Sequence, residues 1–252
     1  SFKALMGGID RLVLVPHAAL HGLPLHALSV GGRPLIAAHA VSYAPSLGVL
    51  AAVRAAAGAR SDRGAPLVGS FAEDPDDRAE FEAEAHAVAT RLRAVPRRQV
   101  SGATLRAVAA TAPLIHVACH GAFDTHDPLA SGVSLSDGVL SAGDLLSLRL
   151  RCDIATLSAC ETGRLAARQG DELLGLPRAL LQAGAASVLV ALWRVYSDST
   201  LSWMQRFYGA LAVPATQRPT RAEAFRTATL AQRATDPDPC AWAAFMLTGD
   251  PG

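Results

Sequence analysis

The chain has 252 residues, half of them hydrophobic, and its formal net charge at pH 7 is +1. A chain of this length can bury a substantial core, and the near-neutral charge gives no overall attraction to nucleic acid or to an anionic membrane. Lys3 is the only lysine, so the sequence lacks both an internal lysine for a Schiff base and a glycine-rich phosphate loop with its lysine.

The four cysteines have no Cys-x-x-Cys spacing and form no disulfide-rich pattern, which favours a reducing cytoplasmic location. There is no apolar run of about eighteen residues and no signal peptide, so we expect no membrane association. The chain begins at Ser1 without a methionine, which is consistent with a fragment of a longer protein.

The first part of the chain alternates between strand-like and helix-like segments. Asp74 followed by Pro75 is typical of a helix start, because aspartate caps the first turn and proline fits the first helical position. The expected strands cover residues 11–15, 40–43 and 67–71, and the expected helices cover residues 47–57 and about 74–92.

Two features of this first part invite a functional interpretation that we do not favour. Residues 17–26 contain three histidines, but no carboxylate or thiol completes a zinc-binding set, so we expect no metal site. Glu80, Glu82 and Glu84 form a charge run, which more often marks the solvated face of a helix than an acidic site.

Two stretches in the middle of the chain, residues 114–121 and 154–163, each read as a buried strand that ends in a reactive side chain and turn residues. Such strands are typical of a parallel sheet in an α/β fold, whose sites lie beyond the carboxyl ends of the strands. His120 and Cys160 would both emerge at that edge. If the two strands are neighbours, about 5 Å apart, a thiol and an imidazole can meet there.

The second half of the chain continues the same alternation. We expect a polar loop over residues 123–138 at the edge that carries His120, and a second exposed loop over residues 164–170. Capping-box patterns at residues 141–144 and 220–223 predict two helix starts. Further helices are expected over residues 141–148, 171–183 and two C-terminal segments, and a further strand over residues 187–193.

The chemistry of a Cys/His pair explains why these positions are candidates. Cysteine is often a small core residue, but Cys160 lies at a strand end, where His120 could act as its base. The backbone N–H groups of Gly121 and Cys160 are candidates to stabilise an oxyanion. His116 and Cys119 are expected to be structural, since one is too far along the strand and the other faces the opposite side.

No third residue that orients His120 is evident from the sequence. Asp124 and Asp127 lie close to His120 along the chain, but the sequence does not indicate the conformation of their loop.

Taken together, several motifs resemble the CHAT domain, a caspase- and separase-like cysteine peptidase domain that often follows tetratricopeptide repeats in bacteria. The likeness extends to both ends of the chain, with Leu14-Val15-Pro16 at the start and Trp242-Ala243-Ala244-Phe245 near the close. The central motifs are His116-Val-Ala-Cys-His120-Gly121, Leu157-Ser-Ala-Cys160-Glu161-Thr-Gly163 and the segment from Gly175 to Trp193.

This resemblance implies a caspase-like three-layer α/β sandwich with a mostly parallel central sheet, formed by residues 1–252 as a single domain. It implies a Cys160 and His120 dyad, without a cofactor or metal, that cleaves protein or peptide substrates. It also implies control by a sensor domain, possibly of tetratricopeptide repeats, in the same chain or a partner, within bacterial immunity or cell-death signalling. The exposed loops over residues 123–138 and 164–170 are the segments that we expect such control to rearrange.

One departure concerns the substrate pocket. Family members commonly have Trp-x-Val-x-Asp after the last core strand, whereas here Ser197 takes the aspartate position and Asp198 follows it. An acidic residue there helps bind a basic side chain before the scissile bond in related peptidases. Selectivity for Arg or Lys is therefore an open question, and the pocket candidates are Asp198, Trp193 and Glu161.

A second function stays open from the sequence: a caspase-like scaffold that binds a partner without catalysis. The presence of both dyad residues argues against it. A serine hydrolase is disfavoured further, because there is no Gly-x-Ser-x-Gly motif.

Overall fold

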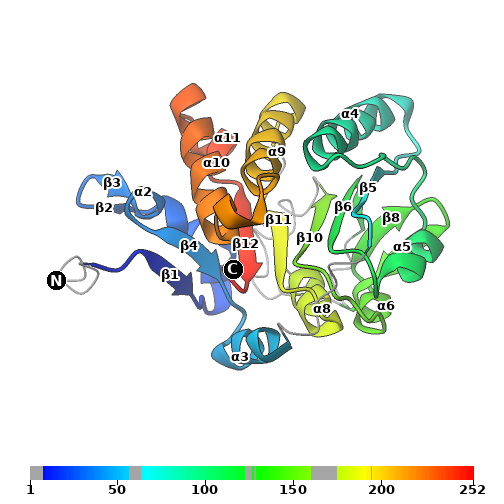
Figure 1. Ribbon diagram of the computed structural model, residues 1–252, viewed down its shortest axis with the longest axis horizontal. Helices are drawn as coiled ribbons and strands as arrows, with labels where there is room; N and C mark the ends of the chain where they lie inside the picture. The colour runs from blue at the N-terminus through cyan, green and yellow to red at the C-terminus, as the bar shows by residue number, and fades with distance from the viewer. Residues whose placement is uncertain (1–7, 57–63, 123–126, 128, 160–174, 194) are drawn as a thin grey trace.

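The computed structural model describes residues 8–56, 64–122, 127, 129–159, 175–193 and 195–252. Within these residues the main sheet has seven strands (Figure 1). From one edge to the other they are β1 (Arg11–Leu14), β4 (Ala40–Tyr43), β12 (Phe245–Gly249), β11 (Ser187–Ala191), β10 (Ile154–Ala159), β6 (Leu114–Cys119) and β5 (Leu67–Ser70).

Every neighbouring pair in this sheet is parallel except β11 and β12, which are antiparallel. All residues of the central strands β10 and β11 are buried, as is usual when helices cover both faces of a parallel sheet. The expected mostly parallel α/β sheet is confirmed, and its strands end one or two residues earlier than the sequence indicated at residues 15, 71 and 193.

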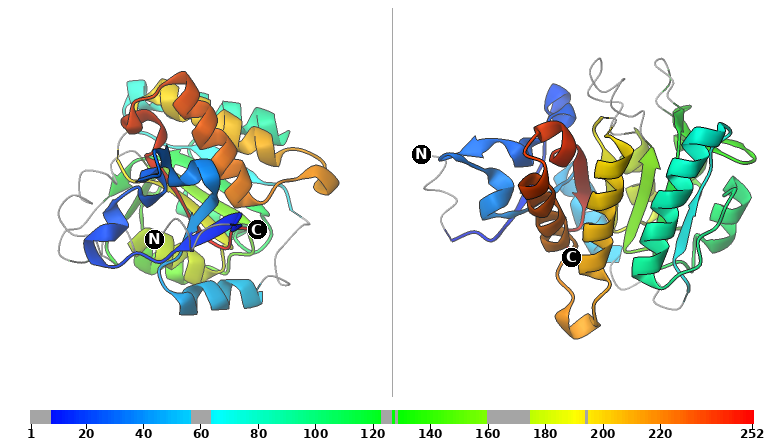
Figure 2. Two further views of the ribbon diagram at one scale, coloured as in Figure 1. Left: turned by 90° about the vertical axis from the view of Figure 1, so that its left-hand side faces the viewer. Right: turned by 90° about the horizontal axis from the view of Figure 1, so that it is seen from above.

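Helices cover the sheet on both faces, which gives three layers (Figures 1 and 2). One layer consists of α4 (Pro75–Leu92), α9 (Ser197–Leu211) and α10 (Arg221–Thr235). The other consists of α3 (Leu47–Ala55), α6 (Ala142–Leu146) and α8 (Gly175–Ala183). The expected helix over residues 171–183 is therefore seen from Gly175, and its first four positions lie outside the described residues.

Aromatic side chains join the first helical layer to the sheet. The ring of Trp203 on α9 stacks on Phe245 of β12, with centroids 4.3 Å apart, and on Phe207, with centroids 5.2 Å apart. Phe225 of α10 meets Trp203 edge to face. All four rings are fully buried, and each contributes roughly 1.5–3 kcal/mol through burial.

The segment over residues 123–138 departs from the expected loop. Its described part contains β8 (Gly132–Leu135), which pairs with β7 (Gly121–Ala122) and β9 (Gly138–Ser141) in a small antiparallel sheet. Val133 and Leu135 are buried, so this short segment has a hydrophobic face that its polar surroundings concealed. Gly132 is required in this position, because a Cβ there would lie 2.3 Å from the Leu140 carbonyl oxygen.

The helix starts follow the local sequence signals. The Asp74 carboxylate accepts hydrogen bonds from the first turn of α4, and both capping boxes, at Ser141 with Asp144 and at Thr220 with Glu223, are formed. Hydrogen bonds from Thr220 lower the pKa of Glu223 below its usual value. Shorter elements complete the described chain: η1 (Ala18–Gly22), η2 (Leu25–Ala27), β2 (Ser29–Val30), β3 (Arg33–Pro34), α2 (Leu35–Ala38), α5 (Gly102–Val108), η5 (Ala215–Gln217) and α11 (Pro239–Trp242).

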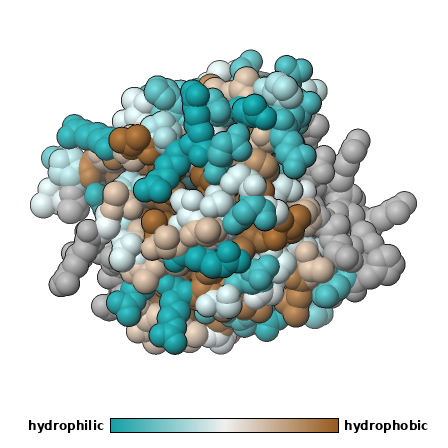
Figure 3. Space-filling view, turned by 90° about the vertical axis from the view of Figure 1, so that its right-hand side faces the viewer, coloured by the Kyte–Doolittle hydropathy of each residue, from teal (hydrophilic) through white to brown (hydrophobic). Residues whose placement is uncertain are grey.

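The surface beside the β5 edge mixes hydrophilic residues with smaller hydrophobic areas (Figure 3). Val95 and Val139 are among the exposed hydrophobic residues of the chain. No helix in the described part of the chain combines the length and the hydrophobicity that crossing a membrane requires.

Candidate functional site

The register of β6 and β10 defines the candidate site. The two strands are parallel neighbours, and their last residues, Cys119 and Ala159, are paired. In the sequence His120 follows the first of these and Cys160 follows the second. The expectation that both stretches are adjacent strands ending at one edge is therefore confirmed. Cys160 itself lies outside the described residues, so its pairing with His120 stays a prediction.

An aspartate from another part of the chain holds the imidazole of His120. Nε2 of His120 lies 3.0 Å from Oδ2 of Asp77, and both side chains are about one-third exposed. Asp77 lies in the first turn of α4, which follows β5, the strand that pairs with β6. Because an ionised carboxylate only accepts hydrogen bonds, Nε2 of His120 is the protonated nitrogen of the neutral ring. Its Nδ1 then carries the lone pair.

Phe81 supports the imidazole from one side. Its ring lies 4.9 Å from that of His120, centroid to centroid, with the planes inclined at 64°. Asp77 and Phe81 are four residues apart on α4 and so lie on one face of the helix. Phe81, Ala72 and Ala118 form a small buried cluster beneath the site. One helical turn therefore supplies both the hydrogen-bond acceptor and the packing surface for His120.

The backbone after His120 is held by the small sheet. The N–H of Ser134 donates to the carbonyl of His120 at 2.8 Å, which makes His120 and Ser134 the hydrogen-bonded pair of that ladder. The next pair in the register is Gly121 with Val133. In an antiparallel ladder this is the non-hydrogen-bonded pair, whose N–H groups point away from the partner strand. The N–H of Gly121 is thus not used by β8.

A pocket with acidic residues lies between α4 and α9, on the other side of Phe81. It has a volume of about 330 Å³, and Glu80, Phe81, Glu84 and Asp198 contribute to its lining. Asp198 is exposed and lies in the first turn of α9. The hydroxyl of Ser197 donates to the carboxylate of Glu80, which joins the two helices at the rim.

The expectation of a fully solvated glutamate face is wrong for Glu84. This residue is three positions after Phe81 and so turns toward the sheet with Ala85 and Val88. Its side chain is buried, and Oε1 has no hydrogen-bond partner within the described residues. Glu82 behaves as expected, since it is partly exposed and lies 3.3 Å from Nη2 of Arg98.

The other predicted pocket residues, Trp193 and Glu161, are not seen in the pocket that contains Asp198. Trp193 is half-buried, and its Nε1 donates to the Cys240 carbonyl at 3.0 Å, so its indole is held against α11. Trp193 does not line the pocket that contains Asp198. Glu161 lies outside the described residues, as does Asp124. Asp127 accepts a hydrogen bond from the N–H of Leu129, which is a local turn contact.

His116 and Cys119 occupy the structural positions that the sequence indicated. Both are fully buried, on the strand that leads to His120. Nδ1 of His116 lies 3.1 Å from the Tyr208 hydroxyl, which also lies 2.7 Å from Oγ1 of Thr156. Burial raises the pKa of Tyr208 well above its usual value, which favours the protonated phenol.

The second nitrogen of His116 faces a carboxylate. Its Nε2 lies 3.2 Å from Oε1 of Glu84, and neither atom has a hydrogen-bond partner within the described residues. The contact links β6 to α4 in the core beneath the site.

Of the three histidines in residues 17–26, His17 is exposed, whereas His21 and His26 are buried. The ring of His26 forms a hydrogen bond through Nδ1 with the Tyr43 hydroxyl at 2.8 Å. Burial lowers the pKa of His26 to about 3, so its ring is neutral. Among the residues that are described, no group of three His, Cys, Asp or Glu side chains is placed to hold a metal ion.

Solved structures share this arrangement of sheet and helices. Separase in the Saccharomyces cerevisiae separase–securin complex has a TM-score of 0.62 and 15% identity, over 92% of this chain and 15% of that chain. The Arg-specific cysteine proteinase gingipain R (RgpB) of Porphyromonas gingivalis has a TM-score of 0.56 and 12% identity, over 84% of this chain and 54% of that chain. The fold therefore places the chain among the caspase-like α/β proteins.

The sequence comparison identifies the family. The CHAT domain family matches residues 3–250, and the chain belongs to this family. Tetratricopeptide repeat protein 28 of Mus musculus is 35% identical over 117 residues. That match covers 46% of this chain and only 5% of the length of the mouse protein.

Proposed function

We propose that the chain is a cysteine endopeptidase in which Cys160 is the nucleophile and His120 is the base. The observation that carries this proposal is the His120 imidazole, held by Asp77 at the end of the strand next to the one that precedes Cys160. A histidine with its outer nitrogen bound to a carboxylate has the correct tautomer to accept a proton at the other nitrogen. Asp77 is then a positioning residue, a role that the sequence did not reveal.

The proposed reaction proceeds in two steps. Nδ1 of His120 takes the thiol proton, and the Cys160 sulfur attacks the peptide carbonyl carbon. The oxyanion that forms is stabilised by the N–H groups of Gly121 and Cys160. As the C–N bond breaks, His120 gives the proton to the departing amine. Water, deprotonated by His120, then hydrolyses the thioester and releases the second product with the thiol restored.

The acidic pocket beside Phe81 supports a preference for a basic side chain before the scissile bond. Glu80, Glu84 and Asp198 bring three carboxyl groups to one pocket, and Phe81 joins that pocket to His120. A guanidinium or ammonium group complements such a lining. Asp198, which lies one position after the usual aspartate of the family motif, would thus act together with Glu80 and Glu84 of α4.

Control by a protein partner is part of the proposal. The match to a tetratricopeptide repeat protein supports a repeat or other sensor region, in the same chain or in another protein, as the regulator of this domain. We infer that residues 1–252 form one domain of a longer protein. A role in bacterial defence stays a prediction.

Cleavage-site profiling tests the proposed function. A peptide digest of a proteome is incubated with the wild type or with Cys160→Ala, and new amino termini are identified by mass spectrometry. We expect termini that depend on Cys160 and follow Arg or Lys. If the folded wild type yields no more termini than Cys160→Ala, the endopeptidase proposal is wrong for this chain and a binding scaffold is favoured.

A further inference from the structure

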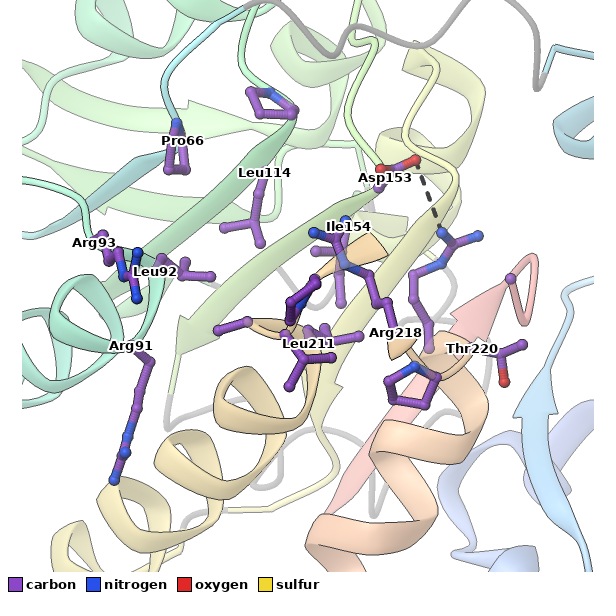
Figure 4. Close-up of a pocket in the computed structure, with 17 residues that line it drawn as sticks. Pro66, Arg91, Leu92, Arg93, Leu114, Asp153, Ile154, Leu211, Arg218 and Thr220 are labelled. Atoms are coloured by element: carbon purple, nitrogen blue, oxygen red, sulfur yellow. Dashed lines mark ion pairs between the residues drawn. The ribbon is translucent and has the colours of Figure 1, made fainter. Parts of the chain in front are cut away.

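A second and larger pocket lies at the start of β6 and β10, at the opposite end of these strands from His120. Figure 4 shows the residues that line it. Its volume is about 730 Å³, and the first residues of β6 and β10, Leu114 and Ile154, contribute to it. The end of α4, the end of α9 and the segment before α10 complete the walls. Since β6 runs from Leu114 to Cys119, about 17 Å separate this pocket from the His120 edge.

Arginines dominate the charge of this pocket. Arg91 and Arg93 come from the end of α4, and Arg218 comes from the segment between α9 and α10. All three are exposed, and within the described part of the chain no carboxylate forms an ion pair with them. Arg218 and Ile154, the first residue of β10, line the same pocket (Figure 4). Three positive charges are therefore available to an incoming group.

A fourth arginine of the pocket, Arg221, differs from these three because it is already paired with carboxylates. Nη2 of Arg221 lies 3.0 Å from Oδ2 of Asp250, and its Nη1 lies 3.8 Å from Oδ1 of Asp153. This guanidinium is mostly buried and already paired, so it stabilises the wall of the pocket.

The rest of the lining indicates what kind of anion fits. Leucines, an isoleucine, a valine and four prolines provide an apolar floor. Among the residues described around the pocket none is aromatic, so a nucleobase would find no stacking surface. Arginine binds carboxylates through two parallel hydrogen bonds, and aliphatic side chains fit an apolar floor.

We propose that this pocket is a docking site for an acidic protein segment that carries aliphatic residues between its carboxylates. The segment places its aliphatic side chains on Leu114 and Val213, which are partly exposed, and its carboxylates on Arg93 and Arg218. Because the pocket lies at the opposite end of β6 from His120, the bound segment does not cover His120. The proposal does not depend on peptidase activity.

Selection from a random-peptide phage library tests the proposal. The library is selected on the wild-type chain and counter-selected on the Arg93→Glu/Arg218→Glu double variant. We expect peptides with Asp or Glu interleaved with Leu, Ile or Val. In fluorescence anisotropy, binding of an enriched peptide should weaken about tenfold or more in the double variant and should weaken as salt is raised. Arg33→Glu, an exposed arginine on β3, is the matched control and should bind normally.

The outcomes that overturn the proposal are equally defined. Enriched peptides without an acidic bias, or with equal affinity for the double variant, would show that the arginines do not select the partner. Tighter binding of an oligouridylate RNA or of inorganic triphosphate, lost in the double variant, would show a phosphate site instead. If the charge reversals unfold the chain, Arg93→Gln/Arg218→Gln provides the same comparison.

Discussion

Nε2 of His120 and Oδ2 of Asp77 lie 3.0 Å apart, although 43 positions separate the two residues in the chain. The parallel pairing of β5 with β6 produces this contact, because both strands end on the same side of the sheet and α4 begins shortly after β5 ends. The carboxylate fixes which nitrogen of His120 carries the proton, and so leaves on Nδ1 the lone pair that the proposed base requires.

Asp77→Asn should lower kcat/KM for peptide cleavage by about 10²- to 10⁴-fold, because an amide can stabilise the wrong tautomer of His120 and cannot stabilise its charged form. The pH profile of kcat/KM should change as well, which a purely structural role would not cause. Asp76→Asn, in the same helical turn and without a contact to His120, is the control and should keep normal activity. Equal activity of both variants would exclude Asp77 as a positioning residue.

The acidic pocket leads to a prediction about specificity. Glu80→Gln/Asp198→Asn removes two charges from the lining while keeping the shapes of the side chains. We expect kcat/KM for substrates with Arg before the scissile bond to fall by roughly tenfold or more, with little change for an uncharged side chain. Glu82→Gln, which is on the same helix but outside this pocket, is the control. A uniform loss for all substrates would argue against a specificity role.

The buried hydroxyl of Tyr208, beneath the site, leads to a prediction about stability. Tyr208→Phe removes a hydroxyl that contacts both Thr156 and His116 in the core. Leaving these groups unsatisfied should lower the free energy of unfolding by about 1–3 kcal/mol, measured by urea denaturation. Tyr196→Phe alters a side chain that is 86% exposed and should change stability by less than about 0.5 kcal/mol. Similar values for both variants would contradict the structure.

His26 predicts how stability depends on pH. Its pKa is about 3 in the folded chain, below the usual value of 6.5, because burial disfavours the charged ring. The unfolded chain therefore binds more protons between these two values. The contribution of His26 is fully present above about pH 6.5 and is lost as the pH falls, by up to about 1.4 kcal/mol per pH unit.

Urea denaturation between about pH 4 and pH 7 measures this dependence. His26→Gln should flatten the slope of the free energy of unfolding against pH, and His17→Gln, at an exposed position, should not. An unchanged slope in His26→Gln would show that other groups determine the acid sensitivity.

Much of the fold could be predicted because its signals are local. Apolar runs located the central strands, and the capping residues Asp74, Ser141 and Thr220 located three helix starts. The sheet formed by β8 and β9 was missed because its strands are short and separated by polar residues. Their pairing depends on contacts that the local pattern does not contain.

The sequence predicted only part of the candidate site. His120 could be found because it ends a buried strand and belongs to a family motif. Asp77 could not, since an aspartate in the first turn of a helix usually only complements the helix dipole. Its role depends on the relative placement of α4 and β6, which is a tertiary property. Glu84 was misassigned for the same reason, because its burial follows from the packing of α4 on the sheet.

Intact-mass labelling with peptidyl acyloxymethyl ketones tests the proposed dyad most directly. The probes differ in the residue before the reactive group, and the proteins are the wild type, Cys160→Ala, His120→Ala and Asp77→Asn. We predict one added probe on the wild type, fastest with Arg or Lys, none on Cys160→Ala, and strongly slowed addition on the other two. Labelling that persists in Cys160→Ala, or that is unaffected by His120→Ala, would contradict a Cys160 and His120 dyad.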